Sequence, residues 1–233
     1  MLLSIIVPTY QLGPYFAGML AALSKQTVTH ELWLIDDGST DGTAELAATY
    51  AHQHAATHFH GFAQHRGVSA ARNYGLAHAT GDALAFVDGD DVIAPTFAAT
   101  LLAGFTPGVV AVSVGYRWFR ALPAHETGWQ QLDQAAMFDQ VTHHGTAVGG
   151  YVWNKAFLRS AIGGLRFDET LSIAEDYWFT ASFVAQNAGR YAYWPGLLYE
   201  KRNRPNSTIH TAGWQARRTE DAVFARIRQL RLR

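Results

Sequence analysis

The chain has 233 residues, of which 48% are hydrophobic, 13% aromatic and 16% charged, and it contains no cysteine. This composition supports a packed core, excludes an intrinsically disordered chain and suits one large domain. The lack of cysteine excludes disulfides and thiolate metal sites and favours a cytoplasmic location. We expect no signal peptide, because the N-terminal apolar run is short, and no apolar run reaches the roughly 20 residues that span a bilayer.

The formal net charge of −1 conceals an uneven distribution. From Glu200 onward the chain carries nine Lys and Arg residues against three acidic ones, so the preceding part is acidic. A basic end on an acidic body indicates either an anionic partner, such as a membrane surface, or simply a solvated terminal helix.

The first hundred residues alternate strand and helix patterns. We predict strands at residues 3–7, 32–35, 57–62 and 83–87. We predict helices at residues 14–25, from the turn at 36–42 to about residue 54, and at 69–79. This order predicts an α/β fold with a mostly parallel sheet flanked by helices, in which ligands bind beyond the carboxyl ends of the strands.

Beyond residue 95 the pattern is less regular. It predicts a long strand at 109–118, helices at 154–162 and 175–187, and short strands at 191–194 and 197–199, and it leaves 129–141 ambiguous. A last helix is predicted at 214–231, with Trp214, Val223, Phe224, Ile227 and Leu230 on one apolar stripe.

Three carboxylates crowd the end of the fourth predicted strand, at Asp88, Asp90 and Asp91. Such groups repel one another unless a cation lies among them, so the cluster indicates a hard divalent metal and, through it, a phosphate ligand. The alternative is an ordinary acidic turn. Asp36 and Asp37 follow the second predicted strand, so the sheet can bring both acidic groups to one edge.

Several motifs occur in a characteristic order: SIIVPTY at 4–10, DDGSTDGT at 36–43, GVSAARNYG at 67–75, FVDGDD at 86–91, and EDYWF at 175–179, preceded by WNK at 153–155 and FDE at 167–169. In this combination the chain resembles the family 2 glycosyltransferases, from about residue 3 to residue 208. The resemblance implies the Rossmann-like GT-A fold. It implies a nucleotide-sugar-binding half at 1–95 and an acceptor-binding, catalytic half of the same domain at 96–210. The remaining 211–233 form the basic amphipathic helix.

The resemblance also implies roles for individual residues. The nucleotide-binding residues would be Pro8, Thr9, Tyr10, Asp37, Arg72, Asp88 and Asp90. The family's DxD element is Asp88-Gly89-Asp90, with Asp91 added. It would hold Mn²⁺ or Mg²⁺ through Asp90 or Asp91, in keeping with the preference of these ions for oxygen ligands. Arg72, or Arg66 before it, would meet the diphosphate or orient an aspartate.

Glu175 and Asp176 open a predicted helix, where the helix dipole favours ionised acids. The family pattern assigns the catalytic base to Asp176 and places Glu175 at the acceptor or in support of the loop. The alternative is helix capping by these acids.

The implied activity is metal-dependent, inverting transfer of a sugar from a UDP- or GDP-sugar to a hydroxyl of a glycan or lipid-linked acceptor. The usual setting of such relatives is polysaccharide assembly for the cell envelope, at the inner face of the membrane. The basic helix would contact the membrane, pair in a homodimer or pack on the domain, and no nucleic-acid partner is expected. Two alternatives stay open: a sugar-phosphate nucleotidyltransferase, although residues 8–15 lack the usual basic residues, and a non-catalytic sugar-nucleotide-binding protein.

Other features of the sequence are weaker indications of function. His52, His54, His58 and His60 are expected on the solvated surface rather than at a metal. Trp153 and Trp178 would stack on sugars or pack in the core. His65 stands where family members commonly carry Asn. Residues 201–208 resemble a mobile loop, in which Arg202 and Arg204 would bind phosphate and His210 would join the metal.

Overall fold

A computed structural model describes residues 1–118, 128–202 and 214–233, with side chains in the last segment from residue 217 onward. The strands are β1 Leu3–Thr9, β2 Glu31–Asp36, β3 Thr57–Gly61, β4 Ala83–Phe86, β5 Val92–Ile93, β6 Val109–Arg117, β7 Gln130–Leu132, β8 Lys155–Leu158 and β9 Arg190–Glu200. The helices are α1 Tyr15–Leu23, α2 Thr43–Gln53, α3 Val68–His78, α4 Phe97–Ala103, α5 Gln134–Thr142, α6 Arg159–Ile162, α7 Glu175–Gln186 and α9 Trp214–Ile227.

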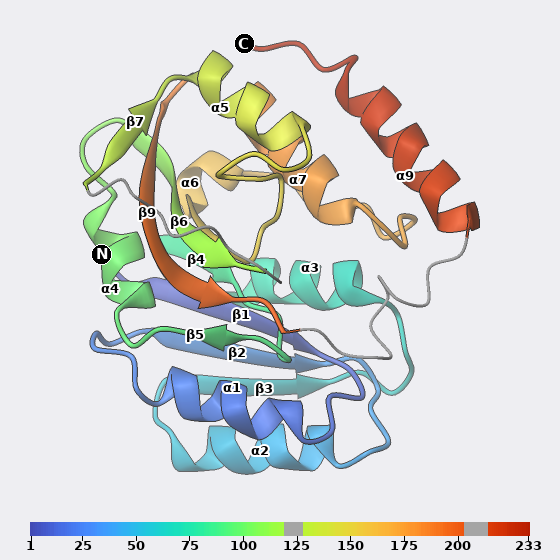
Figure 1. The fold of residues 1–233 in the computed structure, drawn as a ribbon. Coiled ribbons are helices and arrows are strands. Elements are labelled where there is room, and N and C mark those ends of the chain that lie inside the picture. Colours follow the sequence, from blue (N-terminus) through green and yellow to red (C-terminus); the bar gives the residue numbers. More distant parts are fainter. Residues whose placement is uncertain (119–127, 203–213) are drawn as a thin grey trace.

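One mixed sheet runs through the described part of the molecule, in the order β3-β2-β1-β4-β8-β6-β9-β5, with β7 paired to β9. The first four strands in this order are parallel, and β8 is antiparallel to both of its neighbours. The sheet therefore continues across the predicted boundary near residue 95. The predicted α/β class with a Rossmann-like first half is confirmed (Figure 1).

Alternate residues of β1 face two different hydrophobic cores. Leu3, Ile5 and Val7 pack in the core that contains α1, whereas Ile6 packs in the core that contains α3. Figure 1 shows α1 and α2 on one face of β1–β3 and α3 on the other. Both faces are covered, so β1 is buried along its whole length, as its mostly apolar sequence predicts.

Two predictions in the second half were wrong. Residues 155–158, expected in a helix, form β8, and only Arg159–Ile162 is helical. The pairing of β8 with both β4 and β6 overrides its local helical pattern, because each edge of the segment gains a hydrogen-bonded partner. The two short strands expected at 191–199 are one strand, β9, whose register shifts absorb the interruption at Pro195–Gly196.

The last helix packs on the domain instead of presenting its apolar stripe to solvent. Val223 and Ile227 of α9 are buried in the core that contains α7, and Arg226 lies 4.2 Å from the Trp178 ring. Three roles were expected for this stripe, and one of them, packing on the domain, explains the burial of Val223 and Ile227. Within the described ranges, no helix has both the length and the apolar character needed to cross a membrane.

Candidate active site

The two acidic turns lie on either side of the end of β1. Asp37 N–H donates to the Thr9 carbonyl across 2.8 Å, which places the first turn against one side of Thr9. On the other side is Gly89, where a Cβ atom would lie 3.3 Å from Thr9 Cγ2 and only 2.5 Å from a methyl of Leu12. A side chain at Gly89 would have to displace the Leu12 side chain and would press on the end of β1, and glycine avoids both contacts.

Asp36 and Asp37 are both buried, but their partners differ. Asp36 accepts hydrogen bonds from the hydroxyls of Thr9 and Ser39 and from Ser39 N–H, so it shapes the turn. Asp37 accepts from the backbone N–H groups of Arg66 and Gly67, at 2.6 and 2.7 Å. Asp37 thus holds the loop that leads into α3, and its contact with a nucleotide stays a prediction.

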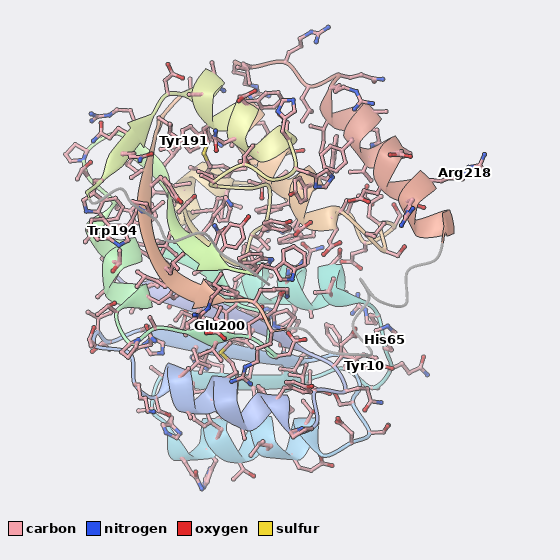
Figure 2. All side chains as sticks on the ribbon, in the orientation of Figure 1. Tyr10, His65, Tyr191, Trp194, Glu200 and Arg218 are labelled. Carbon is pink, nitrogen blue, oxygen red and sulfur yellow. The ribbon has the colours of Figure 1, made fainter. Side chains whose placement is uncertain are left out.

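Tyr10 and His65 form an exposed stack beside Asp37. Their ring centroids are 4.1 Å apart, and His65 Nδ1 lies 2.8 Å from Asp37 Oδ2. Figure 2 shows the two side chains together at the end of the molecule where β1 and β2 terminate. Tyr10 is 38% exposed, so the ring predicted to stack on a nucleobase is accessible, with the unexpected His65 against it.

Arg72 links the acidic turn after β4 to the start of α7. Its side chain is buried; one terminal nitrogen donates to Glu175 Oε1 at 2.8 Å and the other to Asp88 Oδ1 at 3.1 Å. Despite burial, the two carboxylates raise the pKa of the guanidinium. Two roles were expected for Arg72: meeting the diphosphate or orienting an aspartate. The structure shows contacts with two acids, which lie 16 and 103 residues away in the sequence.

The end of β9 supplies partners that the sequence analysis missed. Asp91 is fully buried; its Oδ2 accepts from Tyr199 Oη at 2.6 Å and from Lys201 Nζ at 3.0 Å, and its Oδ1 accepts from Arg202 N–H at 2.8 Å. Lys201 Nζ also lies 2.8 Å from Asp88 Oδ2. A lysine directly after the last strand was the only signal in the sequence that could have indicated this contact.

These contacts decide how the acidic turn fits a divalent ion. The oxygen-only side chains suit Mg²⁺ or Mn²⁺, and the lysine ammonium between two of them shows that the turn accommodates positive charge. Both oxygens of Asp91 already accept hydrogen bonds, and direct ligation by Asp90 or Asp91 stays a prediction. No group of three or more His, Asp or Glu side chains in the described segments is arranged around a metal position.

Asp176 lies in the first turn of α7, next to Glu175. Its Oδ1 accepts from Tyr177 N–H at 2.8 Å. Burial and then the charge of Glu175 raise its pKa to about 7, although Arg72 opposes them. A carboxylate with a pKa near neutrality is suited to accept a proton from a hydroxyl.

Other predicted residues have structural partners. Trp153 is buried and stacks on Tyr151 and Tyr199, so it packs in the core. His54 and His58 stack on Tyr50 and Trp33, respectively. Arg204 and His210 lie outside the described residues.

Lys155 belongs to the WNK motif, but the sequence analysis gave it no role. It is fully buried and donates to the carbonyls of Val148 and Tyr151 and to Asn154 Oδ1. Burial lowers its pKa well below the usual value, against the attraction of Asp176. Lys155 therefore holds the loop that precedes β8.

A cavity of about 460 Å³ lies away from these groups. It is lined by α1, β5 and the ends of β6 and β9, with Lys25, Arg117 and Leu197 among its residues. None of the predicted site residues lines it.

The fold matches solved glycosyltransferases. S. aureus TarS 1–349 in complex with UDP-GlcNAc superposes with a TM-score of 0.80 at 21% identity, over 100% of this chain and 68% of that one. The mannosyltransferase PcManGT from Pyrobaculum calidifontis, in complex with GDP-Man and Mn²⁺, gives a TM-score of 0.66 at 22% identity, over 88% and 58% of the two chains. At these identities the likeness establishes the GT-A fold.

Sequence comparison identifies the family. The chain is 31% identical over 217 residues to the uncharacterized glycosyltransferase EpsJ of Bacillus subtilis, covering 88% of this chain and 62% of EpsJ. It is 25% identical over 219 residues to the minor teichoic acid biosynthesis protein GgaB of the same species, covering 90% of this chain and 24% of GgaB. The family model described as glycosyl transferase family 2 matches residues 4–162. The chain therefore belongs to glycosyl transferase family 2.

Proposed function

We propose that this protein transfers a sugar, with inversion, from a nucleoside-diphosphate sugar to a hydroxyl of a glycan or lipid-linked acceptor. Several solved relatives of the fold are complexes with UDP-GlcNAc, GDP-Man or UDP, which supports a nucleotide-sugar donor. The similarity to a teichoic acid biosynthesis protein supports an acceptor in cell-envelope polymer assembly. We place this activity at the cytoplasmic face of the membrane.

The Arg72 bridge is the observation that carries this proposal. Arg72 contacts both Asp88 and Glu175, so the acidic turn and the start of α7 lie within one side-chain length of each other. Asp176 is the neighbour of Glu175 and has a pKa of about 7. A donor held at the acidic turn would lie near a group that can accept a proton.

The reaction follows from these positions. Asp176 accepts the proton of the acceptor hydroxyl while that oxygen forms a bond to the anomeric carbon. The bond from this carbon to the phosphate oxygen breaks, and the nucleoside diphosphate leaves with the electron pair. A divalent ion held by Asp90 would neutralise the charge on the departing diphosphate. Asp37, with the loop of Pro8, Thr9 and Tyr10, would bind the base and ribose, and Asp88 and Arg72 would complete the donor side.

Asp90→Asn tests the proposal with the purified protein, Mn²⁺ and a panel of UDP- and GDP-sugars. We expect release of nucleoside diphosphate by the unmodified protein, loss of release on chelation by EDTA, and at least a hundred-fold loss in the variant, which lacks one ligand charge. Asp139→Asn is the matched control, because Asp139 lies on α5 with a side chain that is 69% exposed. Full turnover in Asp90→Asn would refute the metal assignment, and release of pyrophosphate would identify nucleotidyl transfer instead.

A further inference from the structure

Asp88 and Asp91 share a cation that belongs to the chain itself. Lys201 Nζ lies 2.8 Å from Asp88 Oδ2 and 3.0 Å from Asp91 Oδ2, and the Lys201 side chain is only 13% exposed. Hydrogen-bonded ion pairs at these distances are among the stronger polar contacts in proteins. Two carboxylates of the acidic turn are therefore already neutralised in part by an ammonium group.

The residues on either side of Lys201 keep its ammonium group in place. Tyr199 and Arg202, on either side of Lys201, both donate to Asp91, through the phenol and the backbone N–H respectively. Tyr199 Oη also accepts the N–H of Asp88 at 3.1 Å. The residues around Lys201 are thus fastened to the turn at several points, and Lys201 does not reach the carboxylates as a loose surface side chain would.

A fixed positive charge here acts differently on the two ligands expected at the turn. It repels a divalent ion that approaches Asp88 and Asp90, and it attracts the negative diphosphate of a donor. When both ligands bind together, the phosphate charge offsets the repulsion between the ammonium and the metal.

We propose that Lys201 is the resident cation of the acidic turn: it holds Asp88 and Asp91 together without metal and makes metal binding depend on the diphosphate. Lys201 is thus a positioning residue for the metal and the donor. This inference rests on the proposed metal and diphosphate site.

Lys201→Met separates this role from simple structural support, because the two ligands should respond in opposite directions. Without nucleotide, the variant should bind Mn²⁺ at least about ten-fold more tightly than the unmodified protein, since one unit charge a few ångströms away is removed. Without metal, it should bind UDP several-fold more weakly. Titration calorimetry at mildly alkaline pH, where the carboxylates are ionised, measures both constants.

Lys25→Met is the matched control. It makes the same charge change at an exposed lysine just after α1, and both constants should stay as in the unmodified protein. Lys201→Arg keeps the charge and should keep weak Mn²⁺ binding in the absence of UDP.

Thermal unfolding tests the inference even if Lys201→Met is unstable. The metal-free variant should melt at a lower temperature, and millimolar Mn²⁺ should restore most of the loss, because the divalent ion takes the place of the ammonium. A purely structural lysine would lower stability without any gain in Mn²⁺ affinity, and that result would overturn the inference. So would a variant that stays unfolded with Mn²⁺ present. If the unmodified protein binds no Mn²⁺ even with UDP, the proposed metal site fails first, whatever the variant does.

Discussion

Asp176 is half-buried beside Glu175, and its loss of solvation together with the charge of Glu175 raises its pKa to about 7. A base acts only when it has lost its proton. The raised pKa therefore keeps Asp176 partly protonated at neutral pH and makes it a stronger proton acceptor once it is ionised.

The pH dependence of turnover tests this role. The rate should rise as the pH increases through about 7, because the ionised fraction of Asp176 grows in that range. Asp176→Asn should lower kcat by about 10²- to 10⁴-fold, the usual contribution of general base catalysis, and leave UDP affinity unchanged. Retention of the same pH profile in Asp176→Asn would show that another group accepts the proton.

At the level of elements, Arg72 fastens α3 to two segments that meet only in the folded chain. It contacts Asp88 in the turn after β4 and Glu175 at the start of α7, and its guanidinium also lies 5.3 Å from the Phe167 ring. Because all of these groups are mostly buried, the charges depend on one another for compensation.

Arg72→Met should reduce the free energy of unfolding by about 3–5 kcal/mol, because it leaves two carboxylates without their shared partner. Urea denaturation measures the loss. Arg228→Met, at an exposed arginine after α9, should change it by less than about 0.5 kcal/mol. A loss for Arg72→Met as small as that of the control would mean that the bridge contributes little to the fold.

A second prediction at the level of elements concerns the packing of α9 on the domain. Ile227 is fully buried against the core that contains α7, so Ile227→Ala should lower stability by about 2–5 kcal/mol. Arg226→Gln should change it by at most about 1 kcal/mol, because its ion pair with Asp168 is solvent-exposed. Thermal or urea unfolding of the two variants measures both losses of stability. Equal, small losses would show that α9 is not part of the cooperative fold.

Across the whole molecule, one sheet joins the strands that carry both acidic turns to β9, whose end carries Lys201. Ligand binding at the turns should therefore stabilise the entire domain rather than one half. With UDP and Mn²⁺ at about a hundred times the dissociation constant, stability should increase by about 2.7 kcal/mol.

Differential scanning fluorimetry measures this effect. The melting temperature should rise as one transition with UDP and Mn²⁺ together, and EDTA should remove most of the rise. Two separate transitions, only one of which responds, would show that the halves unfold independently.

Local patterns predicted the first half of the fold well. Val7, Leu34 and Phe86 belong to apolar runs too short for a buried helix and flanked by turn residues, so their strand assignments needed no knowledge of their partners. Lys155–Leu158 could not be assigned in this way, because its strand conformation comes from pairing with β4 and β6. The single strand β9 was missed for a similar reason: its pairing with β6 continues past Pro195.

The identity and order of the acidic and glycine-containing turns were enough to indicate the family, and they predict the edge of the sheet and the residues that form the candidate site. These features are local, since they depend on residue type and short spacing. Only the tertiary structure decided which charges face one another: Arg72 between Asp88 and Glu175, and Lys201 between Asp88 and Asp91. Those pairs join residues as far as 113 positions apart, and a sequence pattern does not encode such contacts because folding, not chain proximity, brings the partners within hydrogen-bond distance.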